Sequence, residues 1–287
     1  MEKKKSSKIG QIMKMIRQSK KLTLKETTGG EFSESQLARF EKGETELTVD
    51  KFFIILKRTN TYLDEYQHIY NSYLDTDEMF FQKRLTEAYS KKDNKTIKEI
   101  YNFWVKQEQN DPTNKYNTIN KIVVKVVLAM SQKSKALEED IVFLMDYLDR
   151  VEEWGRYEIW IFGNCLRYFD DSSLKYYGKY ILGKTNFYHT IHLNQQMVIR
   201  TFLNIIDTWL RRGNLAQAYI YIQHTKDLHI KIDFFYEKII LKYHEGHYSY
   251  LQGNEKGRET MRKCAQHIEF YGYLQEAQLL YEEIENL

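Results

Sequence analysis

The stretch Phe32–Glu44, which reads FSESQLARFEKGE, carries the signals of a short helix and of its two ends. Ser33 and Gln36 fit an S-x-x-Q capping box, in which the two side chains satisfy backbone N–H groups at a helix start. The pair Lys42-Gly43 places a cation in the last turn and a glycine just past it, as helix ends commonly do. The sequence therefore predicts a short helix that begins after Ser33 and ends near Lys42.

The two faces of this predicted helix differ. Leu37 and Phe40 share one face and are expected to point inward. Ser35, Gln36 and Arg39 lie toward another face, within the first two turns. The recognition helix of a helix-turn-helix places the residues that touch base edges there. The stretch therefore predicts a DNA-reading surface.

Residues 8–66 are predicted to form five short helices, of which the stretch above is the third. A second capping box, Thr23 with Glu26, opens the helix before it, and Gly29-Gly30 ends that helix. The fourth helix starts at Thr48 and the fifth near Thr61. The apolar positions that these helices carry are Ile9, Ile12, Met13, Ile16, Leu37, Phe40, Phe52, Phe53, Ile55, Leu56, Leu63 and Tyr66.

Positive charge gathers beside this region. Net charge is +3, and residues 1–25 hold nine Lys or Arg against one Glu, whereas the residues after 75 hold equal numbers of each sign. Phosphate binding favours such a surplus. A solvated lysine tail at Lys3–Lys5 is the alternative. The candidate phosphate contacts are Arg17, Lys20, Ser33, Ser35 and Lys42.

Gln36 and Arg39 are the candidate base readers. A glutamine can pair with an adenine edge and an arginine with a guanine edge, each contributing roughly 1–3 kcal/mol of discrimination. The alternative for Gln36 is that it serves only as the capping-box partner of Ser33.

Composition predicts an all-α protein. The 287 residues include one proline, Pro112, and no long Gly or Ser tract. Two cysteines, Cys165 and Cys264, imply no disulfide framework. No apolar run approaches the ~20 residues of a membrane span, and the charged N-terminus has no signal-peptide core, so a cytoplasmic protein is expected.

The chain is expected to comprise a helix-turn-helix domain of the Cro type at 1–66, a linker helix at 67–79 and a repeat domain at 80–287. In the repeat domain, small turn residues introduce second helices at Asp93-Asn94, Gly155, Gly213-Asn214 and Gly253-Asn254. The interval from Gly246 to Gly253, with Ala265 beyond, resembles tetratricopeptide repeats. About five helix pairs are expected to stack into a right-handed solenoid with an inner groove.

Taken together, the segments SESQLARFEKGE (33–44) and WGRYEIWIFGNCLRYF (154–169) resemble the Rgg family (Rgg/GadR/MutR) of transcriptional regulators, part of the RRNPP peptide-sensing group. The resemblance covers essentially the whole chain. Ala38 stands where a serine is common. Some members link their dimer through a cysteine in the DNA-binding domain, and this chain has none there.

The resemblance implies a homodimer that binds promoter DNA and is controlled by a short hydrophobic peptide pheromone, as in quorum sensing. RNA polymerase is a further candidate partner, and no cofactor or membrane partner is expected. The family uses the arginine of the GNCxRF segment for peptide, which points to Arg167, with Asn164 three residues before it.

Further peptide candidates come from polar residues in apolar helices. Asn204 lies within the apolar run 202–206, where a buried amide needs a partner. Tyr236 and Tyr243 are candidates for the groove, although tyrosines at helical spacing are more often core. For Arg167 the alternative is an internal ion pair with Glu158 or Asp170.

Metal and enzyme functions find no support. His189/His192 and His244/His247 have i, i+3 spacing rather than the HExxH spacing, and no CxxC pair is present. These histidines are expected simply to lie on helix faces. No phosphate loop, dinucleotide fingerprint or nucleophile elbow is present, so no catalytic residue or metal site is predicted.

Two alternative functions remain. The repeat domain could bind a protein partner, as in phage, immunity or toxin–antitoxin regulators. It could also act as a phosphatase or scaffold regulator with the DNA-binding domain secondary.

Overall fold

The structure, a computed structural model, describes residues 2–74, 77–184, 191–228 and 230–287. Over these residues it contains helices and no β-strand, so the all-α prediction is confirmed. The chain divides into two compact units, Met1–Arg84 and Leu85–Leu287. None of the described helices is long and apolar enough to cross a membrane.

The described part of the first unit holds five complete helices. They are α1 (Glu2–Ser19), α2 (Leu24–Thr28), α3 (Glu34–Glu41), α4 (Val49–Arg58) and α5 (Leu63–Leu74). The next helix, α6 (Asp77–Ser90), contains the division between Arg84 and Leu85. The expected linker range 67–79 thus contains the end of α5 and the beginning of α6.

Helix starts in the first unit follow the sequence signals in part. Thr23 and Glu26 form a complete capping box, and Gly29 ends α2 in the left-handed conformation (φ 58°). Gly43 likewise has a positive φ of 74° after α3. Thr48 precedes α4 but makes no side-chain cap.

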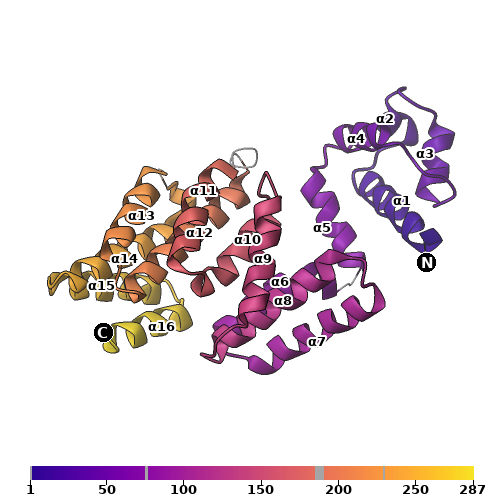
Figure 1. The fold of residues 1–287 in the computed structure, drawn as a ribbon. Helices are drawn as coiled ribbons and strands as arrows, with labels where there is room; N and C mark the ends of the chain where they lie inside the picture. Colours follow the sequence, from indigo (N-terminus) through magenta and orange to yellow (C-terminus); the bar gives the residue numbers. More distant parts are fainter. Residues whose placement is uncertain (1, 75–76, 185–190, 229) are drawn as a thin grey trace. The chain divides into compact units, whose positions relative to one another are not determined.

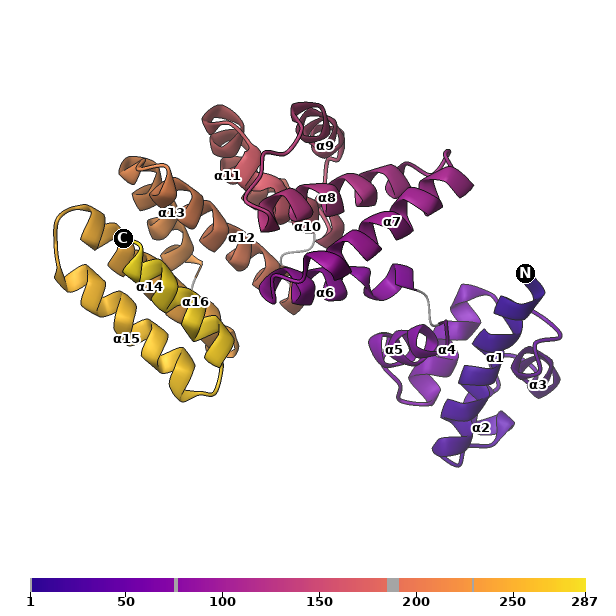
Figure 2. The ribbon, with the colours of Figure 1, turned by 90° about the horizontal axis from the view of Figure 1, so that it is seen from below.

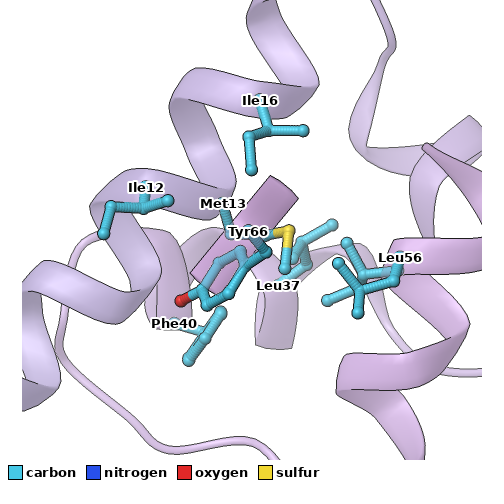
Figure 3. Close-up of a cluster of buried hydrophobic side chains, with 8 residues drawn as sticks. Ile12, Met13, Ile16, Leu37, Phe40, Leu56 and Tyr66 are labelled. Carbon is cyan, nitrogen blue, oxygen red and sulfur yellow. The ribbon is translucent and has the colours of Figure 1, made fainter. Parts of the chain in front are cut away.

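The core of the first unit gathers around α1, which packs against both α3 and α5. Figure 3 shows these buried side chains converging: Ile12, Met13, Ile16, Leu37, Phe40, Leu56 and Tyr66. Ile55 completes the cluster. Two of the apolar positions named from the sequence, Phe53 and Leu63, are exposed. Because Leu37 and Phe40 are buried in this cluster, the opposite face of α3 is left for solvent.

The second unit is a run of helices and two short 3₁₀ turns. They are α7 (Asn94–Asn110), α8 (Lys115–Ser131), α9 (Glu138–Arg150), α10 (Arg156–Cys165), η1 (Leu166–Tyr168), α11 (Asp171–Lys184), α12 (His192–Arg211), α13 (Leu215–Asp227), η2 (Ile232–Phe234), α14 (Phe235–Leu251), α15 (Lys256–Phe270) and α16 (Leu274–Glu285).

Neighbouring helices of this unit pack in sequence, α7 on α8, α12 on α13, α14 on α15 and α15 on α16. Both views show α14, α15 and α16 side by side (Figure 1 and Figure 2). The predicted turn residues Asp93 and Asn214 cap α7 and α13 with their side chains. Helices α14 and α15 cross closely at Gly246 and Gly257, where a Cβ on Gly257 would lie 2.4 Å from the Gly246 carbonyl oxygen.

Candidate DNA-reading surface and repeat-domain cavity

Helix α3 presents the predicted DNA-reading side chains to solvent. Ser33 caps its start, accepting a hydrogen bond from the Gln36 backbone N–H at 3.2 Å. The Ser33 and Ser35 hydroxyls lie 3.3 Å apart. Arg39 is 62% exposed, and its Nε is 3.9 Å from Glu44 Oε2, a loose surface pair. Such pairs contribute little, so the Arg39 guanidinium is available to an anion or a base edge.

The capping box predicted at Ser33 is only half formed. The Gln36 side chain does not return to the Ser33 backbone; its Oε1 accepts a hydrogen bond from Lys51 Nζ of α4 at 2.8 Å. The prediction failed on this side chain because the contact comes from a helix 15 residues away in the sequence. Neither of the two roles expected for Gln36, base reader or capping-box partner, involves Lys51.

Two of the predicted phosphate contacts are engaged within the unit. Arg17 donates to both carboxylate oxygens of Glu41, at 2.6 and 2.7 Å, and to the Leu22 carbonyl. Its side chain is only 11% exposed, and the hydrogen bond with Glu41 raises its pKa. Arg17 is therefore a structural cation that holds α1 against α3, which corrects the sequence interpretation.

Lys20 also has internal partners. Its Nζ donates to the carbonyls of Thr59 and Asn60 at 2.7 and 2.9 Å, at the C-terminal end of α4. A lysine there is favoured by the negative end of the helix dipole. Lys42, by contrast, is exposed just after α3.

In the second unit, three of the predicted peptide contacts line one cavity. The cavity has a volume of about 190 Å³. Its lining consists of Leu85, Thr86, Tyr89, Val127, Met130, Gly163, Asn164, Leu166, Arg167 and Asn204. Four of these side chains are apolar, and two hydroxyl groups, two amides and one guanidinium supply the polar part of the lining. This composition suits an apolar ligand with one polar or anionic group.

The polar part of the lining comes from different elements, and Asn204 differs from the sequence interpretation. Asn164 lies near the end of α10, where its Nδ2 donates to the Trp160 carbonyl at 2.7 Å, but Arg167 lies in the following turn η1. Asn204 is exposed rather than buried, because α12 turns this position away from its apolar neighbours. Asn204 thus needs no protein partner and can offer its amide to the cavity.

Arg167 makes an internal ion pair, although with neither of the expected residues. Its Nη2 donates to Asp207 Oδ2 of α12 at 2.5 Å. Glu158 instead accepts from the Gly155 N–H at 3.0 Å, and Asp170 caps the start of α11 through the Ser173 N–H. The partner of Arg167 lies 40 residues away, beyond reach of local sequence patterns.

Asp207 is the centre of a buried network. Arg211 also binds it, with Nε 2.9 Å from Oδ1, and reaches Glu283 of α16 at 2.8 Å. Burial alone would raise the pKa of Asp207, but the guanidiniums of Arg167 and Arg211 hold it below its ordinary value. The network therefore keeps a charged carboxylate inside the repeat unit.

Two histidines expected on helix faces are buried beside this network. His244 and His247 of α14 are 6% and 3% exposed. Within the described part of the chain, their Nδ1 atoms have no hydrogen-bond partner. Burial lowers the pKa of His244 to about 4 and lowers that of His247. Both are therefore neutral near pH 7.

The two tyrosine candidates lie away from the cavity lining. Tyr243 is 1% exposed in a core cluster with Met261, Cys264 and Ile284. Tyr236 is 40% exposed on the first turn of α14. Tyr243 is thus a core residue, the alternative that its helical spacing favoured.

The described residues contain no group of three or more His, Cys, Asp or Glu side chains that could hold a metal. His189, one half of a histidine pair considered from the sequence, lies outside the described residues.

Known proteins resemble this chain throughout. The family described as "HTH-type transcriptional regulator Rgg, C-terminal domain" matches residues 103–283. The Streptococcus dysgalactiae SHP pheromone receptor Rgg2 is 23% identical and superimposes with a TM-score of 0.79, over 96% of this chain and 99% of that one.

Two further solved structures share the fold. A crystal structure from Listeria monocytogenes EGD-e is 21% identical with a TM-score of 0.82, covering 98% of this chain and 97% of that one. The PrgX/cCF10 complex is 15% identical with a TM-score of 0.67, covering 98% and 99%. At these identities the likeness establishes the fold: a helix-turn-helix domain with a tetratricopeptide-like helical domain. Because the family match spans more than half of the sequence, the chain belongs to the Rgg family of helix-turn-helix transcriptional regulators.

Proposed function

We propose that this protein is a homodimeric, DNA-binding transcriptional regulator controlled by a short hydrophobic peptide bound in its repeat domain. One observation carries the proposal: a single chain combines a helix, α3, that exposes Arg39 with a cavity lined by both apolar and polar side chains, Arg167 among them. Two proteins of the same fold are described as a pheromone receptor and as a complex with cCF10. Such a regulator would act in the cytoplasm, where promoter DNA is accessible.

On the DNA side, Arg39 would read a guanine edge from the exposed face of α3. Ser33, Ser35 and Lys42 would contact phosphates around it. Arg17 is not part of this proposal, because Glu41 holds it within the core. In a dimer, two such helices would enter successive major grooves about 34 Å apart.

On the peptide side, Arg167 would bind a carboxylate of the ligand, and the amides of Asn164 and Asn204 would bind its backbone. The apolar lining would take a hydrophobic side chain. Asp207 already holds Arg167, so a ligand carboxylate would share the guanidinium or displace Asp207 from it. The peptide would control transcription only through different affinities for two conformations of the protein.

The DNA side is tested by recovering genomic fragments bound by the purified protein, beside Arg39→Ala. We expect a few near-palindromic sites that the variant loses, because Arg39 supplies a specific contact. Arg262→Ala is the matched control, since it removes an exposed arginine of α15 from the other unit. Equal site preference for wild type and Arg39→Ala would refute the assignment.

The peptide side is tested with a set of synthetic short apolar peptides, each with a free or an amidated C-terminus. A ligand that binds the native state raises the unfolding temperature. We expect stabilisation by particular free-carboxylate peptides, lost in Arg167→Met. Stabilisation only by a folded protein partner would favour the partner-binding alternative instead.

A further inference from the structure

A contact between α3 and α4 changes what Gln36 can read. Lys51 Nζ lies 2.8 Å from Gln36 Oε1 and 5.6 Å from the centre of the Phe32 ring. Phe32 packs against the core of the first unit, so the ring that Lys51 contacts is itself held in place. Gln36 and Lys51 are both half-buried rather than fully enclosed.

The orientation of the Gln36 amide follows from chemistry. A lysine ammonium has three N–H donors and no acceptor, so only the amide oxygen can face it. The amide nitrogen of Gln36 therefore points elsewhere, with two N–H donors. Lys51 contributes further N–H groups, so the pair offers mainly hydrogen-bond donors. The Gln36 oxygen is engaged on the side that faces Lys51.

The major groove distinguishes bases by their acceptors and donors. Adenine presents the N7 acceptor and the N6 donor, so a glutamine reads it with both its nitrogen and its oxygen. Guanine presents two acceptors, N7 and O6. The donors of the pair match the two acceptors of guanine, whereas the adenine N6–H would have to share Gln36 Oε1 with the Lys51 ammonium, and the adenine amino group would face that cation.

We propose that Gln36 and Lys51 act together as a donor pair that selects guanine over adenine, and that Lys51 is the specificity-determining residue. The inference rests on the proposed function, in which α3 enters the major groove. It assigns Lys51, a residue of α4, a role in base selection and reverses the adenine preference that glutamine alone suggests.

Position and exposure argue for more than a structural contact. Gln36 lies in the first turn of α3, where recognition helices contact base edges. The ion pair Arg17–Glu41, which also joins two helices of this unit, has side chains 11% and 3% exposed and closes off its polar groups. Gln36 and Lys51 are both half-buried, whereas Glu41 is buried, so the Gln36–Lys51 pair is less enclosed.

The test selects binding sites from random duplex DNA with the full-length wild type, Lys51→Met and Lys51→Arg. Lys51→Met keeps an unbranched apolar stem but frees Gln36 Oε1. We expect guanine at one position of each half-site to give way to adenine, a change in relative affinity of roughly 5- to 150-fold. Lys51→Arg keeps a donor and is expected to retain guanine.

Lys57→Met is the matched control, because it removes the same charge from an exposed position of α4. It should leave base preference unchanged. Gln36→Met gives a second route: it removes the amide and should abolish discrimination at the same position. Thermal unfolding of each variant reports whether it is folded.

Two results would overturn the inference: adenine at that position in the wild type, or selected sites that stay unchanged in Lys51→Met. Failure of the proposed function looks different, because then even the wild type would enrich no site.

Discussion

Helix α3 and the repeat-domain cavity each present an arginine, but one arginine is loosely paired at the surface and the other is bound to a buried carboxylate. Arg39 is 62% exposed and loosely paired with Glu44 at 3.9 Å. Arg167 is 40% exposed and bound to a carboxylate that is itself 9% exposed. The first can bind an anion at little cost to the fold. The second can do so only by sharing or exchanging Asp207.

This difference suits the two ligands proposed. DNA contacts form and break along a surface, where an unengaged cation contributes salt-dependent affinity. A regulatory ligand must instead change the conformation of the protein that binds it. Asp207 connects Arg167 to Arg211, which in turn reaches Glu283 of α16, so a ligand that displaced Asp207 would act on a network that extends to the last helix.

The largest effect is expected from Asp207→Asn. The change leaves two guanidiniums without their shared buried carboxylate, and we expect it to lower the free energy of unfolding by about 2–4 kcal/mol. Both arginines are partly exposed, which keeps the value below that of a fully buried pair. Chemical denaturation measures it.

Asp171→Asn is the control for this prediction. Asp171 pairs with Arg212 at 2.6 Å but is 57% exposed, and its loss should cost less than about 1 kcal/mol. Equal losses from the two substitutions would show that burial of Asp207 does not matter, and the contrast drawn above would fail.

An intermediate effect is expected from acidification. The pKa of His244 is about 4 in the folded protein, below its ordinary 6.5, so the unfolded chain binds the proton more readily. The stability contributed by neutral His244 is therefore present above pH 6.5 and is lost as pH falls toward 4. Between pH 7.5 and 5 the loss should be about 2 kcal/mol.

Denaturation at the two pH values, with His244→Gln as the comparison, isolates this contribution. His247 acts in the same direction, whereas Glu283, whose pKa burial raises, acts in the opposite one. Asp207 titrates below its ordinary 3.8 and so contributes only at lower pH. An identical pH dependence of stability in wild type and His244→Gln would show that His244 does not cause the loss of stability at low pH.

The smallest effect on stability is expected from Arg39→Ala. Because the side chain is exposed and loosely paired, the free energy of unfolding should change by no more than about 0.5 kcal/mol. The far-UV spectrum should be unchanged even though specific DNA binding is lost. A large loss of stability would mean that Arg39 is structural, and the contrast with Arg167 would disappear.

Local chemistry made some features predictable. The capping residues and glycines around α2 and α3 act on backbone groups a few residues away, so the sequence alone located these helices. Apolar periodicity gave the buried stripe of α1 and the inward face of α3. Phe53 and Leu63 lie at apolar positions of their helices and are nonetheless exposed, because helical spacing alone does not show whether another element packs over a side chain.

By itself, the sequence determined the all-α class, the helix-turn-helix, the family and the segments that reach the cavity, because these depend on local caps, periodicity and motif. Only the tertiary structure decided which charges are available. The partners of Arg17, Gln36 and Arg167 lie 24, 15 and 40 residues away. Ion pairs across helix interfaces depend on packing geometry, which no local pattern encodes.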